Sequence, residues 1–140
     1  MYSGIGILTP QLNEVMFKNL FLSVKRGGRL ILDMLNPDWV LKSFIACRHK
    51  TIIIEGQKYN IIHRREILYQ PLREVNYITL TFPYHKEDSY TIQLYSLEEM
   101  SNLLEKYHYK ILFCYGNFSY AVLSPNKPRM IIVADKTRNV

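Results

Sequence analysis

The sequence has few features that would assign it to a membrane, secreted or metal-binding class. No apolar run approaches the roughly 20 residues that a membrane-spanning helix needs. No charged segment leads into an apolar stretch and a small-residue cleavage site, so nothing suggests secretion. The two cysteines, Cys47 and Cys114, lack the spacing of a metal site and are interpreted as reduced thiols. The default expectation is a cytoplasmic protein with no membrane partner.

Local signatures of catalysis are also lacking. His49, His85 and His108 share no spacing that would form a metal site. No Ser–His–Asp or Cys–His pattern appears with the local sequence that accompanies it in known enzymes. We therefore predict no metal, and the sequence leaves the catalytic residues unassigned.

Acidic residues are fewer than basic ones, which gives a formal net charge of +6 and could favour an anionic partner. The basic residues are nevertheless scattered, and the densest groups are Lys25-Arg26, Arg48-His49-Lys50 and His63-Arg64-Arg65. A nucleic-acid footprint should gather such residues on one face. A nucleic-acid binder that stacks bases on a tyrosine-rich sheet therefore remains only a third alternative.

The composition is that of a folded domain, with 48% hydrophobic and 13% aromatic residues in 140. Residues 1–50 open with a predicted helix, in which Thr9 is the N-cap, Pro10 takes the first position and Gly27 takes the left-handed C-cap. The strand predicted next, Arg29 to Met34, is apolar on both faces, as is typical of the interior of a parallel sheet covered by helices. The predicted apolar face of the helix comprises Leu12, Val15, Met16, Leu20 and Val24.

The rest of the chain divides into two parts after a short predicted helix at Trp39 to Phe44. Residues 51–95 alternate between apolar and polar side chains, which predicts an antiparallel meander of three or four strands. Residues 96–140 open with the capping box of Ser96 and Glu99, and two further strands follow that helix. All three parts are interpreted as one partial domain, residues 1–140.

The order of these elements resembles the second half of class I S-adenosylmethionine-dependent methyltransferases, of the small-molecule type with a β insertion. The stretch from Lys25 to Asp33 is similar to the family's L-K-P-G-G segment before its fifth strand, with Arg26 in place of the usual proline. Tyr95 to Met100 resembles the family's Y-[ST]-x-x-E-[LM] helix start, and Tyr115 to Lys136 resembles its final strand pair. The resemblance implies an α/β fold that comprises the last three strands of a Rossmann-like sheet and an antiparallel insertion.

The family's cofactor, S-adenosylmethionine, is held by a glycine-rich turn and an acidic residue in the half of the fold that this resemblance does not cover. Gly4 and Gly6, in a stretch that resembles the loop after the fourth strand, are the candidate cofactor-binding residues. Because no strand precedes them and Thr9-Pro10 starts a helix directly afterwards, we interpret them as loop glycines. The resemblance therefore predicts that this chain binds no cofactor by itself.

The candidate substrate-binding residues each have a structural alternative. Asn36 follows the buried strand, where open α/β sheets bind ligands, but it could equally form an Asx turn with Pro37. Trp39 could line a pocket or belong to the core, and a basic pair, His63 and Arg65, could face an anionic substrate or solvent. The remaining candidates are Arg64, Tyr95, Tyr115 and Arg129. Arg64 faces away from the basic pair. The structural alternative is packing for Tyr115 and an ion pair for Arg129.

Two hypotheses follow from this sequence. The leading one is a fragment of a small-molecule methyltransferase that is inactive alone. The other is a non-catalytic interaction module that forms a homodimer, or that binds a separate N-terminal half through the open edge of the strand at Leu30.

Overall fold

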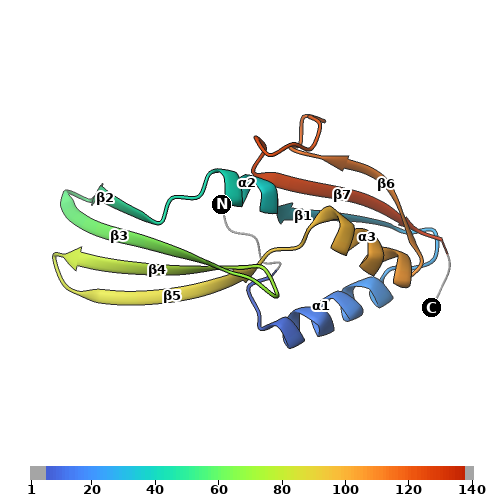
Figure 1. Ribbon diagram of the computed structural model, residues 1–140, viewed down its shortest axis with the longest axis horizontal. Helices are drawn as coiled ribbons and strands as arrows, with labels where there is room; N and C mark the ends of the chain where they lie inside the picture. Colours follow the sequence, from blue (N-terminus) through green and yellow to red (C-terminus); the bar gives the residue numbers. More distant parts are fainter. Residues whose placement is uncertain (1–5, 138–140) are drawn as a thin grey trace.

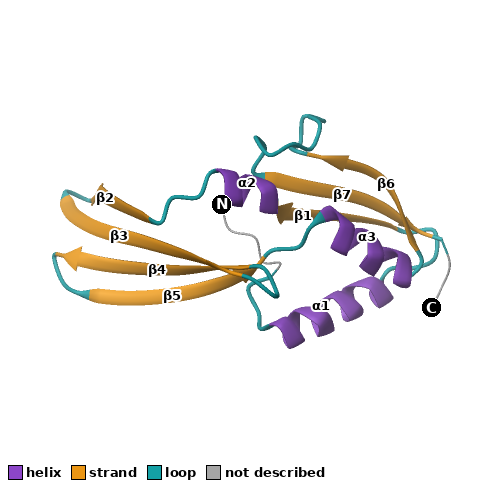
Figure 2. Ribbon diagram, viewed as in Figure 1, coloured by secondary structure: helices purple, strands orange, loops and turns teal. Residues whose placement is uncertain are grey.

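The computed structural model describes residues 6–137, which contain three helices and seven strands. The strands form two separate sheets (Figures 1 and 2). Thr9 and Pro10 begin the first helix as predicted, and the Thr9 hydroxyl accepts a hydrogen bond from the Leu12 amide. No helix in residues 6–137 is long and apolar enough to cross a membrane. The elements in chain order are α1 (Pro10–Ser23), β1 (Arg29–Leu35), α2 (Pro37–Lys42), β2 (Cys47–Ile54), β3 (Gln57–Leu68), β4 (Arg73–Phe82), β5 (Lys86–Gln93), α3 (Leu97–Lys106), β6 (Tyr109–Tyr115) and β7 (Arg129–Lys136).

The first sheet has the order β1-β7-β6, and both of its strand pairs are antiparallel. The last strand of the chain lies in the middle, with Ile132 opposite Leu32 on one side and Cys114 on the other. The prediction of a parallel strand at Leu30 is therefore wrong for the described residues. The apolar sequence of β1 reflects burial of its core-facing side chains, which does not distinguish a parallel from an antiparallel neighbour.

Helices cover only one face of this sheet. Leu30, Leu32 and Met34 pack with residues of α1 and α3 into the main core, whereas Ile31 on the other face is 60% exposed. The expectation that β1 is buried on both faces is thus wrong, because α1 and α3 lie on the same side (Figure 1). We call the uncovered side, which carries Ile31 and Phe113, the outer face.

The buried face of α1 is rotated from the predicted one. Phe17 and Phe21 are almost fully buried, while Leu12 and Val15, expected in the core, are each more than half exposed. The two phenylalanines are four residues apart and therefore lie on one helix face, where their rings stack with centroids 5.6 Å apart. Large aromatic side chains bury more apolar area, so they decide which face turns inward.

The end of α1 also differs from the prediction. The helix stops at Ser23, and Gly27, with a φ of +79°, lies in the turn that follows rather than at the C-cap. The carbonyl groups at the end of the helix bind Lys136 of β7, whose buried ammonium donates to Phe21 O at 3.0 Å and Val24 O at 2.7 Å. A cation from a distant strand therefore satisfies the negative end of the helix.

The second sheet has the order β2-β3-β4-β5, as the alternation in residues 51–95 predicts, although β2 begins earlier, at Cys47. It extends to one side of the molecule, away from α1 and α3 (Figure 1). A small apolar cluster joins it to α2 and comprises Val40, Ile92 and Leu94, with Leu35, Trp39, Ile67, Leu72 and Tyr90 packed around them. This cluster fixes which face of the second sheet is turned toward α2.

Candidate functional site

The candidate site lies on the face of the second sheet that packs against α2, which we call the inner face. Strand register identifies its members, because side chains on one face recur every second residue. Ile67 of β3 and Ile92 of β5, both in the cluster with α2, lie on this face. His63 and Arg65 of β3 therefore share it, since they alternate with the same period as Ile67.

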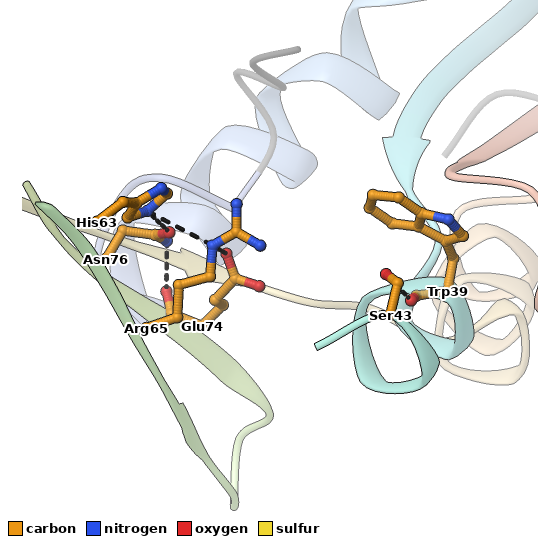
Figure 3. A network of polar contacts seen from close by, with 6 residues as sticks. All are labelled: Trp39, Ser43, His63, Arg65, Glu74 and Asn76. Atoms are coloured by element: carbon orange, nitrogen blue, oxygen red, sulfur yellow. Dashed lines mark hydrogen bonds and ion pairs between the residues drawn. The ribbon is translucent and has the colours of Figure 1, made fainter. Parts of the chain in front are cut away.

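A polar network occupies the inner face beside the apolar cluster (Figure 3). His63 Nε2 lies 2.8 Å from Oδ1 of Asn76, which is 1% exposed. The Nε of Arg65 lies 4.0 Å from an oxygen of Glu74, and their side chains are 26% and 11% exposed. His63 and Arg65 are thus partly buried and hydrogen-bonded or ion-paired, rather than solvated.

Two neighbours contact Nε2 of the His63 ring. Asn76 presents Oδ1 at 2.8 Å, which can only accept a hydrogen bond, whereas the Nε–H of Arg65 donates to the same nitrogen at 3.5 Å. One ring nitrogen cannot serve both contacts at once, so this network does not by itself set the tautomer. An imidazole held in this way can act as a base for an amine or hydroxyl acceptor placed beside it.

Next to the network, the inner face is hollowed and basic. A depression of about 510 Å³ is lined by Arg48, His49, Lys50, Ile61, His63, Arg65, Ile78 and Tyr90. The two basic groups noted in the sequence, 48–50 and 63–65, lie on adjacent antiparallel strands, with Arg48 directly opposite His63. Register thus gathers charges that appear scattered along the chain.

Asn36 and Trp39, two of the predicted substrate-binding residues, belong to α2. Asn36 is 2% exposed and caps the helix: its side-chain oxygen accepts from the Asp38 amide at 3.2 Å. Its amide group donates to the carbonyls of Ser124 and Lys127, both at 2.9 Å, so it also fastens the loop before β7. The indole of Trp39 packs in the small apolar cluster between α2 and the second sheet, and it points toward that sheet (Figure 3). Both structural alternatives therefore have direct support in the contacts.

Arg64 and Tyr95 lie elsewhere. Arg64 is exposed on the opposite face of the second sheet, where its guanidinium lies 5.6 Å from the ring centre of Tyr77. Tyr95 is 9% exposed and lines a groove of about 650 Å³ between α1 and α3. Burial raises the pKa of Tyr95 to about 12, although the neighbouring Asn13 amide acts in the opposite direction.

Tyr115 and Arg129 lie on the first sheet, away from the inner face. Tyr115 stacks on Phe113 with ring centroids 5.7 Å apart and meets Tyr120 edge-on at 5.3 Å. Arg129 forms an ion pair with Asp33 of β1. These contacts agree with packing and ion pairing. Arg129 is the cross-strand partner of Leu35, and the amide of Asn36 donates to the carbonyl of Pro128 at 2.9 Å, so Asn36 and Arg129 are close together at the end of β1.

Of the two candidate cofactor-binding glycines, the structure describes Gly6. Gly4 lies outside the described residues. Gly6 has a φ of +90°, and a Cβ built on it would lie 2.2 Å from the carbonyl oxygen of Gln93. Its own carbonyl accepts a hydrogen bond from the Gln93 amide at 2.8 Å. The absence of a side chain at Gly6 therefore allows close contact with β5, which accounts for this glycine without a cofactor.

Asn76 and Glu74 are the members of the network that the sequence analysis missed. A signal was available, because both occupy the same alternating set as Ile78 and Leu80 in β4. Polar residues in an otherwise apolar set indicate a buried hydrogen-bonded pair. That signal does not, however, identify the partners, which come from β3.

The structure of this chain is similar to solved structures of methyltransferases. No known family matches the sequence, and no curated protein matches it. An S-adenosylmethionine-dependent methyltransferase from Clostridium acetobutylicum matches 99% of the chain with a TM-score of 0.71 at 14% identity, over 55% of its own length. The CcbJ methyltransferase from Streptomyces caelestis matches 96% of the chain with a TM-score of 0.69 at 12% identity, over 58% of its own length.

A third similar structure is CalS10, an amino pentose methyltransferase from Micromonospora echinaspora with bound S-adenosylmethionine. It matches 98% of the chain with a TM-score of 0.63 at 14% identity, over 56% of its own length. The chain thus spans about half of the length of the structures that it matches. The two antiparallel sheets and their helices have the fold seen in class I methyltransferases.

Proposed function

We propose that this chain is the acceptor-binding part of an S-adenosylmethionine-dependent methyltransferase that acts on a small molecule. The observation that carries the proposal is the match of 96% to 99% of the chain to about half of each methyltransferase compared. Those three proteins share the fold while differing from this chain at most positions. A fold alone does not establish activity, so the proposal depends on the inner face as well.

The chain corresponds, in this proposal, to the C-terminal half of a Rossmann-like sheet. Two features support the assignment. The order β1-β7-β6 leaves one edge of β1 without a partner among residues 6–137, where a further strand of the complete sheet can pair. The second sheet also lies between β1 and α3 in the chain, where the resemblance in the sequence implies an insertion.

In the intact fold, S-adenosylmethionine supplies an electrophilic methyl group, and the half of the fold that this chain does not match would hold it. The residues of this chain would bind and orient the acceptor and exclude water around it. Trp39 would offer an aromatic wall, and Asn36 would hold the loop before β7 in place. The His63 imidazole would accept the proton that an amine or hydroxyl acceptor loses as its new bond to carbon forms.

The chain alone is expected not to bind S-adenosylmethionine. Calorimetric titration of the purified 140 residues should give no measurable heat at micromolar concentrations, with a complete methyltransferase as the positive control. A circular dichroism spectrum of the same sample must show folded protein, so that lack of binding reflects the site. Micromolar affinity would overturn the proposal that the other half holds the cofactor.

A second candidate function is a non-catalytic interaction module. The observation in its favour is the uncovered outer face of the first sheet, where Ile31 is 60% and Phe113 is 52% exposed. Apolar side chains gathered beside an open strand edge are a common feature of protein interfaces. The partner would be a second copy of this chain or a separate N-terminal half.

A further inference from the structure

We propose that the hollow on the inner face is an anion-binding subsite that recognises a phosphate or carboxylate group. Its basic side chains are Arg48 and Lys50 of β2 and His63 and Arg65 of β3. In the proposed function this anion would be part of the methyl acceptor, and that assignment depends on the proposed function. Anion binding itself does not, because every lining residue belongs to this chain.

The register of β2 and β3 concentrates positive charge on this face. Arg48 lies directly opposite His63, and Lys50 lies opposite Ile61, one pleat away on the same face. Arg65, two residues from His63 along β3, is the diagonal neighbour of Arg48, and diagonal positions on an antiparallel pair are about 7 to 8 Å apart. An anion bound between these two guanidinium groups would reduce their repulsion.

The acidic residues nearby leave the charge of the hollow largely uncompensated. Glu74 lies 4.0 Å from Arg65 and therefore neutralises that residue alone. Asp88 of β5 is opposite Ile78, which is opposite His63, so it shares the inner face two strands away from His63; it accepts a hydrogen bond from the Ser89 amide and is not among the residues that line the hollow. Within residues 6–137, neither Arg48 nor Lys50 forms an ion pair.

The shape and chemistry of the hollow suit a small anionic group. A guanidinium can donate two parallel hydrogen bonds to a carboxylate or phosphate, and an ammonium adds a point charge. Ile61 and Ile78 form part of the wall, and an apolar wall strengthens the attraction between opposite charges. The Glu74 ion pair orients Arg65 before any ligand arrives.

Pyrophosphate and succinate are suitable probes, because they present the two acid groups without the rest of a substrate. Each is titrated into the 140-residue chain while amide chemical shifts are followed by NMR. We expect saturable shifts at the amides of β2 and β3 around Arg48, Lys50 and His63. The probe that binds more tightly identifies the acid group.

The test variant is Arg48→Ala with Lys50→Ala. Both side chains are exposed on an edge strand, so their removal leaves the core intact. The matched control, Lys18→Ala with Lys110→Ala, removes the same charge from exposed sites outside the second sheet. The test variant should bind the tighter probe at least about tenfold more weakly, while the control stays within about twofold of the original chain.

Three outcomes would overturn the proposal: no saturable shift with either probe, equal weakening in the two double variants, or tighter binding of a single-stranded oligonucleotide than of either probe. None of them involves S-adenosylmethionine. A chain that binds the anion but also binds the cofactor with micromolar affinity would contradict the proposed function and keep the subsite.

Discussion

Tyr95 lies where β5 leads into α3, and its ring meets Phe17 edge-on with centroids 5.1 Å apart. At 9% exposure, the phenol is held away from water, which disfavours its ionised form and raises its pKa to about 12. An unfolded tyrosine ionises near pH 10. The folded state therefore keeps a proton that the unfolded state loses between pH 10 and 12.

This difference predicts a pH-dependent loss of stability. The stabilisation is fully present below pH 10 and falls by up to about 2 kcal/mol as the pH rises to 12. Tyr95→Phe should remove this part of the decline in the free energy of unfolding, measured by urea denaturation at pH 8 to 11.5. Tyr84→Phe, at a position that is 58% exposed, is the control and should leave the decline unchanged. An equal decline in the Tyr95 variant and the original chain would contradict the prediction.

Arg64 and Arg65 show how strongly a single position changes a residue's surroundings. Arg65 is paired with Glu74 on the inner face, whereas Arg64 is exposed over Tyr77 on the other. The alternation of a strand predicts that the two point in opposite directions. It does not predict which direction faces α2, since that depends on the packing of Ile67 and Ile92.

Among the elements, α3 is the one whose start is best determined by local sequence. The Glu99 amide donates to the Ser96 hydroxyl, and the Ser96 amide donates to the Glu99 carboxylate, both at 3.1 Å. This is the capping box predicted from the sequence. Met100 and Leu104, which follow at helical spacing, are fully buried in the main core.

Removing this cap should destabilise the protein measurably. Ser96→Ala leaves the Glu99 amide without its partner and is expected to lower the free energy of unfolding by about 1 kcal/mol. Asn102→Ala, at an exposed position inside the same helix, should change it by less than about 0.5 kcal/mol. Urea denaturation followed by circular dichroism measures both variants. A change of similar size in the two would show that the cap contributes little.

For the molecule as a whole, the outer face of the first sheet is the most conspicuous unpaired surface. Val133 of the central strand β7 lies between Ile31 of β1 and Phe113 of β6, so the three side chains form a row across the sheet. The ion pairs Arg29–Asp135 and Arg129–Asp33 border this row. An apolar strip with polar margins is the arrangement expected of a protein interface.

The chain is accordingly expected to self-associate at high concentration. Ile31→Lys should lower the molar mass measured by light scattering after size-exclusion chromatography toward that of the monomer, because it places a charge in the apolar strip. Ile53→Lys, at a position 72% exposed on the second sheet, is the control and should leave the mass unchanged. A monomer at every concentration that also fails to enhance the fluorescence of an apolar dye would contradict the expected interface.

The sequence by itself determined the local features, because turns, caps and alternation depend on residues close together in the chain. Thr9-Pro10, the capping box and the meander in residues 51–95 could all be predicted in this way. The tertiary structure decided the rest. It placed β7 between β1 and β6, turned Phe17 inward in place of Val15, and left one face of β1 uncovered. It also brought residues 48–50 against residues 63–65. Each of these outcomes depends on contacts between distant segments, and the periodicity of one segment carries no information about its partner.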